Sequence, residues 1–211
     1  MPKSVQVPGP FVPLFEVAEK YVDGLFKEFK HQPEKGTLHI GQERYILVRG
    51  ESLFVTLFEQ LENSFGPEQA QEFIYNMARI IGKSDAEAFT RTRNITDPNE
   101  RLSTGPVHFA YSGWAFVDIL PSSRPSPDAN YFLHYRHPNT FESEIYKRKS
   151  KTAEHPICFF SAGYSAGWCS VAYGLEVHAR EIRCTAKGDA VCEFIMAPFD
   201  KLDEYEIQYK S

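Results

Sequence analysis

Apolar residues recur three and four positions apart along most of the first half of the chain, which is the spacing of amphipathic helices. This spacing predicts a helix over 14–29 that stops before Lys35-Gly36, a second helix over 51–65 and a third from 67 to about 93. Residues 37–50 are rich instead in β-branched and aromatic side chains, which favours a β-hairpin or a pair of short strands. We therefore expect a first half that is mainly helical.

After Arg93 the pattern mixes strands and helices. We expect, in order, a loop or broken helix over 94–110, a buried strand over 114–120, a surface loop over 121–130, a strand over 130–137, a helix over 141–149 and a buried helix over 157–174. Asn139-Thr140 could cap the helix that follows it. Two last strands flank the turn Lys187-Gly188-Asp189.

Together these elements predict an α+β fold: a helical N-terminal region, an antiparallel sheet packed with helices, and a C-terminal hairpin that closes the structure. The chain divides into an extended arm (1–10), a helical subdomain with a short β-hairpin (11–93), a second subdomain (94–198) and a charged tail or linker start (199–211). We expect the two subdomains to share one core.

Composition supports a folded protein and excludes several classes. The chain has 211 residues, of which 42% are hydrophobic and 14% aromatic, so it is not disordered. Its 23 Lys and Arg against 28 Asp and Glu give a net charge of −5, which argues against direct nucleic-acid binding. No apolar run is long enough to span a bilayer, and the N-terminus lacks a signal sequence, so we expect a cytoplasmic protein.

The four cysteines all fall in the last quarter of the chain, at positions 158, 169, 184 and 192. Cys184 and Cys192 have seven residues between them and lie on either side of the Gly-Asp turn, so two antiparallel strands would bring them together. Cys158 and Glu181 would then complete a tetrahedral zinc site. The alternative is that these thiols are small hydrophobic residues of the core.

Two features of this proposed site need an explanation. Glu181 and Cys184 are an odd number of positions apart, so on a regular strand they would face opposite sides of the sheet, and the site requires a bulge between them. Three thiolates, one carboxylate and Zn²⁺ also sum to a charge of −2. Neighbouring basic residues that could offset this charge are Arg180, Arg183 and Lys187.

The segment 155–194 carries three motifs: His-Pro-Ile-Cys at 155–158, Gly-Tyr-Ser-Ala-Gly at 163–167, and an Arg-Glu-x-x-Cys-x-Ala-x-Gly-Asp-x-x-Cys-x-Phe run at 180–194. With these motifs the chain resembles the 4-vinyl-reductase-type small-ligand domain, and in particular the sensor domain of phenol- and xylene-responsive sigma-54 activators of aromatic catabolism. The similarity is weaker upstream of residue 137.

This resemblance implies a structural zinc ion on Cys158, Glu181, Cys184 and Cys192. The family's ligands have intervening gaps of 22, two and seven residues, and the gaps here agree. The zinc would staple the C-terminal hairpin to the preceding helix. Cys169 lies outside the pattern and is interpreted as a core thiol.

The resemblance extends to a helix start at 139–144, to the segment 50–53, and to Gly105-Pro106, which is similar to the start of a strand that carries a pocket histidine. It implies an aromatic ligand pocket lined by His108, His137, Phe132, Tyr164 and Trp168. His137 occupies the position of a family tryptophan, and because imidazole can accept as well as donate, a ligand other than simple phenol is expected. Each of these residues could instead be structural.

The function implied is that of a signal-input domain in transcription regulation. It would bind a small aromatic or hydrophobic molecule, form a homodimer and pass the signal to an output domain or partner, with no catalytic residues. One alternative is an enzyme of tetrapyrrole metabolism, similar to vinyl reductases, although no nucleotide-binding glycine motif is present. Another is haem-based gas sensing, with His108, His137 or His178 as the axial ligand.

Overall fold

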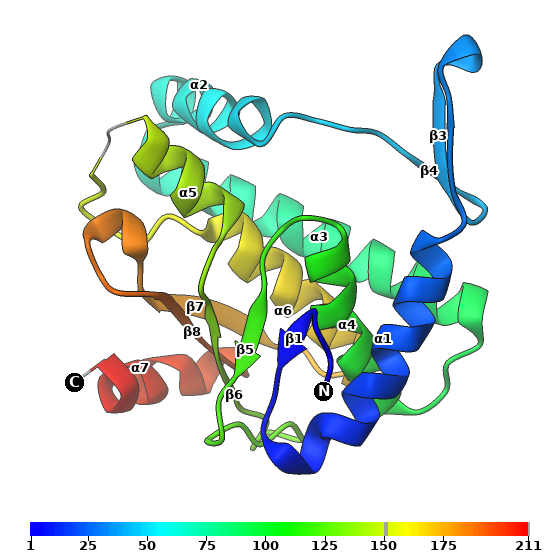
Figure 1. Cartoon of the computed structure of the whole chain (residues 1–211). Coiled ribbons are helices and arrows are strands. Elements are labelled where there is room, and N and C mark those ends of the chain that lie inside the picture. Colours follow the sequence, from blue (N-terminus) through cyan, green and yellow to red (C-terminus); the bar gives the residue numbers. More distant parts are fainter. Residues whose placement is uncertain (150–151, 211) are drawn as a thin grey trace.

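A five-stranded sheet with the order β1-β5-β6-β8-β7 lies at the centre of the computed structural model, which describes residues 1–149 and 152–210 (Figure 1). The strands are β1 (Val5–Gln6), β5 (Val117–Ile119), β6 (Leu133–His137), β7 (His178–Arg183) and β8 (Cys192–Ala197). The pairs β5–β6, β6–β8 and β7–β8 are antiparallel, as expected. β1 runs parallel to β5, so the sheet is mixed rather than antiparallel.

The N-terminal segment is therefore an edge strand and not a free extended arm. Val5 is 2% exposed and pairs with Val117. The carboxylate of Glu19 accepts hydrogen bonds from the backbone amides of Lys3 and Ser4, at 2.7 and 2.8 Å. These contacts give the first residues a fixed path that their composition does not indicate.

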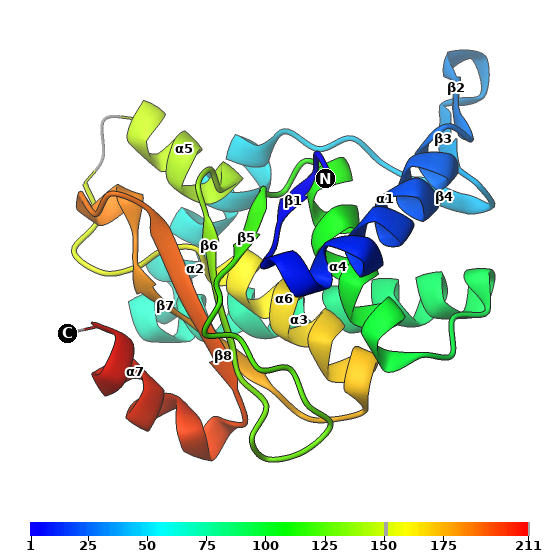
Figure 2. The same cartoon turned by 60° about the horizontal axis from the view of Figure 1, so that its bottom comes forward.

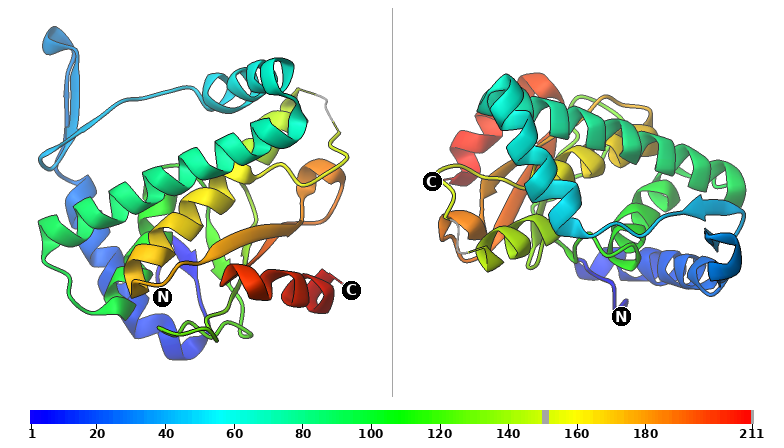
Figure 3. Two further views of the ribbon diagram at one scale, coloured as in Figure 1. Left: turned by 180° about the vertical axis from the view of Figure 1, so that it is seen from behind. Right: turned by 90° about the horizontal axis from the view of Figure 1, so that it is seen from above.

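Two long helices, α3 (Pro67–Arg93) and α6 (Phe159–Tyr173), pack side by side behind the sheet (Figure 3). Their close approach depends on glycine. A Cβ added at Gly82 would lie 2.2 Å from the carbonyl oxygen of Tyr164, and one added at Gly163 would lie 2.2 Å from that of Tyr75. The small residues that predict a buried helix over 157–174 therefore serve to bring two backbones together.

The segment after Arg93 contains a continuous helix, α4 (Pro98–Tyr111), and not a loop or broken helix. The Asp97 carboxylate caps it by accepting from the amides of Asn99 and Glu100, and Pro98 occupies the first turn. Pro106 sits inside the helix without ending it. The expected strand start at Gly105-Pro106 is consequently wrong, and His108 is a helical residue.

The N-terminal half also contains α1 (Val12–Phe26), which packs on α4, and α2 (Leu57–Phe65), which follows a π-helical turn at Ser52–Thr56. The first helix ends at Phe26, three residues earlier than expected, because the chain then forms β2 (Phe29–Gln32). β2 pairs with β3 (Thr37–Ile40), and β3 with β4 (Glu43–Tyr45). This small antiparallel sheet, which includes the expected hairpin, projects from the body of the molecule (Figures 1 and 2).

The remaining helices are α5 (Phe141–Arg148) and α7 (Leu202–Lys210). Thr140 caps α5, as the sequence suggests. Short 3-10 turns occupy Gly9–Phe11, Pro33–Lys35, Thr185–Lys187 and Phe199–Lys201. The tail is thus helical as far as Lys210, and its last residue, Ser211, lies outside the described residues.

One hydrophobic cluster extends from Val5 to Met196 and includes residues of both halves of the chain, as expected of a shared core. A second cluster, of Phe132, Ile182, Ile195, Ala197 and Leu202, lies between α7 and the outer face of the sheet. The sheet therefore has α6 and α3 on its inner side and α7 on its outer side (Figure 2). Within the described residues, no helix has the length and apolar character that crossing a membrane requires.

Candidate functional site

The four residues predicted to bind zinc lie together. Cys158 directly precedes α6, Glu181 lies on β7, Cys184 follows β7, and Cys192 begins β8. One ligand atom from each of the four lies within 4.8 Å of all the others. The turn between the strands depends on Gly188, whose φ of 103° is strained for any other residue.

The expected bulge is present and explains how Glu181 and Cys184 reach the same site. Glu181 pairs with Phe194, whereas Arg183 pairs with Glu193, so the register of β7 shifts by one residue between them. This irregularity turns Cys184 to the side of the sheet that Glu181 faces. The prediction made from the odd offset is confirmed.

The spacing of the donor atoms fits a tetrahedral ion. The Cys158 and Cys192 sulfur atoms are 3.7 Å apart, and a tetrahedron of ~2.3 Å zinc–sulfur bonds has sulfur atoms about 3.8 Å apart. Oε2 of Glu181 accepts the backbone amide of Cys158 at 2.9 Å, whereas its Oε1 is buried without a hydrogen-bond partner among the described residues. A metal ion would satisfy that orphaned oxygen.

The electrostatics of the cluster also favour a cation. Burial raises the pKa of the Cys158 thiol and of the Glu181 carboxyl well above their ordinary values, and each lies near other acidic groups of the cluster. Hydrogen bonds from the neighbouring thiols instead lower the pKa of Cys192. Buried acidic groups this close cannot all ionise unless a positive charge compensates them.

The arginines expected to offset the charge of the zinc site face elsewhere. Arg180 pairs with Asp203 and Glu206 on α7, at 2.7 and 2.6 Å. Arg183 bonds to Glu193 at 2.6 Å on the outer face of the sheet. That part of the charge argument is corrected: these side chains hold α7 and are committed to other carboxylates.

A cavity of about 40 Å³ lies between α4, α6 and the inner face of the sheet. Its lining is almost entirely apolar and consists of Leu102, Gly105, Pro106, Phe109, Val117, Ile119, Leu133, Tyr135, Tyr164, Ser165, Trp168, Cys169 and Met196. Two residues of the predicted pocket, Tyr164 and Trp168, are among them. Trp168 is held in place from both sides, because its indole N–H donates to the Arg101 carbonyl at 2.9 Å and its ring covers Gly105.

His108 lies behind this lining and not in it. Its ring stacks on Trp168 with centroids 5.3 Å apart, and its Nδ1 is 3.3 Å from the Tyr164 hydroxyl. That hydroxyl donates to Asp85 at 2.8 Å, so Asp85, Tyr164 and His108 form a hydrogen-bonded chain. Burial lowers the pKa of His108 to about 4, which leaves the imidazole neutral at pH 7.

His137 is completely buried at the end of β6, beside Phe109 and Tyr135. Its Nδ1 lies 3.0 Å from the carbonyl oxygen of Phe116, which can only accept, so Nδ1 carries the proton. Its Nε2 is buried without a partner among the described residues. His137 is thus one ring away from the cavity, with an unused nitrogen.

The structure does not bring Phe132 to this cavity. Phe132 points to the outer face of the sheet, where its ring lies 4.2 Å from that of Tyr205 and 5.0 Å from that of Tyr209. Side chains alternate along a strand, so Phe132 and His137, five positions apart, face opposite sides. The inclusion of Phe132 in the pocket is corrected on this ground.

Sequence reasoning also misses some residues of the site. Tyr135, between His134 and Arg136 on β6, lines the cavity, and so does Cys169, for which the sequence indicates only a place in the core. Glu142 is buried at the start of α6, where it accepts hydrogen bonds from the amides of Phe160 and Ser161. Strand parity could have identified Tyr135; nothing in the sequence shows which helix end Glu142 would reach.

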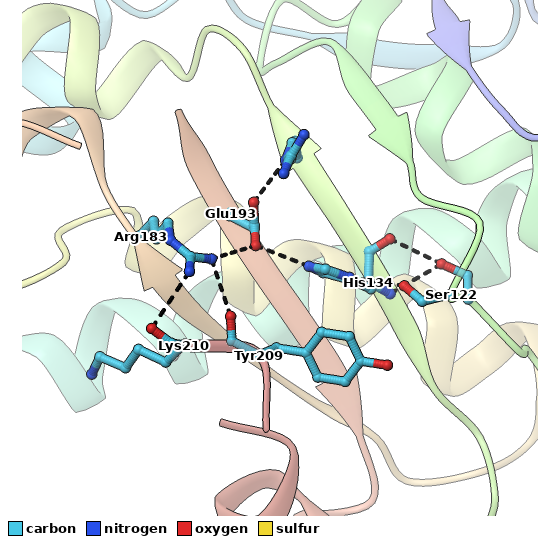
Figure 4. Close-up of polar contacts among 8 residues, drawn as sticks. Ser122, His134, Arg183, Glu193, Tyr209 and Lys210 are labelled. Atoms are coloured by element: carbon cyan, nitrogen blue, oxygen red, sulfur yellow. Dashed lines mark hydrogen bonds and ion pairs between the residues drawn. The ribbon is translucent and has the colours of Figure 1, made fainter. Parts of the chain in front are cut away.

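On the outer face, polar contacts connect the sheet to α7 (Figure 4). The buried carboxylate of Glu193 bonds to Arg183, to Arg136 at 2.7 Å and to His134 at 3.0 Å. Arg183 also donates to the backbone carbonyls of Tyr209 and Lys210, at 3.1 and 3.4 Å. Arg183 therefore joins the strands that carry the cysteine cluster to the last turn of α7.

Two family models match the chain. Residues 138–198 match the 4-vinyl-reductase domain, and residues 24–122 match the family described as "Activator of aromatic catabolism". The transcriptional regulatory protein XylR of Pseudomonas putida is 22% identical over 190 residues, which cover 89% of this chain and 33% of XylR. The chain thus spans about a third of the length of that relative.

Among solved structures, the crystal structure of the phenol-responsive sensory domain of the transcription activator PoxR with phenol matches with a TM-score of 0.76. The match covers 97% of this chain and 99% of that one, at 21% identity. A vinyl-4-reductase family protein from Methanocaldococcus jannaschii has a TM-score of 0.43 and 15% identity over 90% of this chain and 95% of that one. The PoxR match shows a shared fold over nearly the whole chain.

Proposed function

We propose that this chain, a 4-vinyl-reductase-type sensor domain of the kind found in aromatic-responsive activators, binds a small aromatic molecule in the cavity between α4, α6 and the sheet and reports its presence through α7. The observation that carries the proposal is the cavity itself, whose apolar lining includes aromatic side chains from both α4 and α6. The resemblance to a phenol-responsive domain supports the same class of ligand.

The cavity is small for its proposed ligand. Its volume of about 40 Å³ is well below that of the ~150 Å³ cavity known to accept benzene in another protein. A ligand would therefore have to move the lining outward, most readily where α4 and α6 meet the sheet. That requirement makes the ligand a selector between a contracted and an expanded state.

Zinc is the metal that best suits the cluster of Cys158, Glu181, Cys184 and Cys192. Three sulfur ligands and one carboxylate satisfy a tetrahedral ion, and four protein ligands leave no position open for water, so the ion would be structural. It would hold the start of α6 against the β7–β8 hairpin. These elements carry part of the cavity lining, because Trp168 and Cys169 lie on α6 and Met196 lies on β8.

The route to an output lies on the other face of the hairpin. Met196 lines the cavity from β8, and Glu193 on the same strand bonds to Arg183, which contacts the end of α7. Expansion of the cavity that displaces β8 would be felt by this pair. The XylR relative is much longer than this chain, which supports a further domain that would receive the signal.

A thermal-shift screen tests the ligand proposal, with metal analysis and visible absorption spectra of the same protein. We expect monocyclic aromatics such as phenol to raise the melting temperature saturably, about one zinc ion per chain, and no haem or flavin absorption. A flavin or haem band would contradict the sensory function and favour the enzyme or gas-sensor alternatives. The matching regulator and sensory domain favour a regulator over an enzyme.

A further inference from the structure

The cavity contains a hydroxyl group that the protein itself does not use. Tyr135 lines the cavity from β6 and is 3% exposed. Its phenolic oxygen is buried and makes no hydrogen bond to any described residue. Buried polar atoms without a partner are uncommon in folded proteins, and each calls for a specific explanation.

Other polar groups of the lining already have partners. The Tyr164 hydroxyl donates to Asp85 at 2.8 Å, and the Trp168 indole N–H donates to Arg101 at 2.9 Å. Ser165 on α6 adds a second hydroxyl, which is near enough to act on the pKa of Tyr135 but does not satisfy its oxygen with a hydrogen bond. A ligand that enters the cavity would therefore meet a largely apolar wall and the free hydroxyl of Tyr135.

Resting on the sensory function proposed above, we propose that Tyr135 determines ligand specificity by donating a hydrogen bond to an acceptor atom on an otherwise apolar, single-ring aromatic ligand. The ligand class is thus an aromatic ring that carries one oxygen, such as a phenol, an aryl ether or an aryl ketone. A plain hydrocarbon of the same size would leave the hydroxyl unpaired.

Two further observations agree with a donor at this position. Burial raises the pKa of Tyr135 well above 10, so the phenol keeps its proton at neutral pH and can donate. The ring itself is fixed, because it stacks on Phe194 with centroids 5.2 Å apart and an interplanar angle of 8°. A fixed donor in a dry cavity discriminates strongly between ligands that can and cannot accept its hydrogen bond.

Calorimetric titration with toluene, anisole and phenol tests this proposal, because the three have similar size and differ in their oxygen. The variants are Tyr135→Phe and, as a matched control, Tyr173→Phe, whose hydroxyl bonds to Asn99 at 2.7 Å away from the lining. We expect Tyr135→Phe to weaken anisole and phenol binding about tenfold and to leave toluene unchanged or tighter. Tyr173→Phe should leave all three affinities unchanged.

The possible results separate the two proposals. If the wild-type protein binds none of the three probes, the sensory function proposed above fails and this inference with it. If the wild type binds them but Tyr135→Phe changes all three affinities equally, the role of Tyr135 alone is overturned. Folding is checked by the unliganded melting temperature, which should rise by about 2 °C or more in Tyr135→Phe because an unpaired buried hydroxyl is removed.

Discussion

The guanidinium of Arg183 lies 2.6 Å from the buried carboxylate of Glu193 and at the same time donates to the last backbone carbonyls of α7. Both residues adjoin proposed zinc ligands in the sequence, since Arg183 precedes Cys184 and Glu193 follows Cys192. The pair therefore joins the metal-bearing hairpin to the C-terminal helix. A change on the cavity side of β8 would have only this one strand to cross.

Removal of this link should loosen α7 without unfolding the domain. In Arg183→Ala we expect amide hydrogen exchange to accelerate over 202–210, while global stability falls by only about 1–2 kcal/mol, because the side chain is a third exposed and Glu193 keeps two partners. Arg148→Ala, which removes an exposed pair with Glu144, is the control. Unchanged exchange of α7 in Arg183→Ala would refute the link.

Substitution at a proposed zinc ligand should be far more damaging than substitution at Cys169. Cys184→Ser leaves the site one thiolate short and should cost more than about 3 kcal/mol and most of the bound zinc. Cys169→Ser only places a hydroxyl in the lining and should keep about one zinc per chain. Metal content and denaturant unfolding of the two variants measure this, and equal metal content in both would count against the assigned ligand set.

The α3–α6 contact should be intolerant of a methyl group. Gly163→Ala places a Cβ 2.2 Å from the Tyr75 carbonyl oxygen, so two helix backbones must separate, at a cost of about 3 kcal/mol or more. Gly24→Ala, on the exposed side of α1 with open space around it, should instead stabilise by about 0.5–1 kcal/mol. Urea unfolding of both variants decides whether the contact is as tight as described.

Acid should destabilise the protein through His108. Burial lowers its pKa to about 4 from an ordinary value of 6.5. Below pH 6.5 the unfolded chain takes up a proton that the folded state refuses, so stability falls as the pH falls toward 4, by about 2 kcal/mol at pH ~5. Zinc ligands also protonate in acid, so the comparison is with His108→Asn, which should lose about 2 kcal/mol less between pH ~7 and pH ~5. Parallel pH profiles would show that His108 is not buried as a neutral group.

The sequence allows the cysteine site to be predicted more completely than the cavity. The ligand spacing, the Gly-Asp turn and the need for a bulge are all local properties, and local geometry decides them. The cavity depends on which face of β6 is turned inward, which only its partners in the sheet determine. Strand parity could nevertheless have shown that Phe132 and His137 cannot share a face.

The error over His108 has a different cause. Gly105-Pro106 favours the start of a strand when read alone, because proline usually interrupts a helix. Asp97-Pro98 nevertheless carries a helix start signal, and the helix continues through Pro106. Packing of α4 against α1 and α6 favours that continuation, and such tertiary packing is invisible in the local sequence.

The most direct test of the central claim, that an aromatic ligand occupies the cavity, uses the three methionines as reporters. Met196 lines the cavity, whereas Met1 is exposed and Met77 lies on α3 outside the lining. In protein labelled with ¹³C at the methionine methyl groups, titration with phenol should shift the Met196 resonance saturably and leave the other two in place. A Met196 resonance that stays fixed throughout the titration, or equal shifts at all three methionines, would contradict the account.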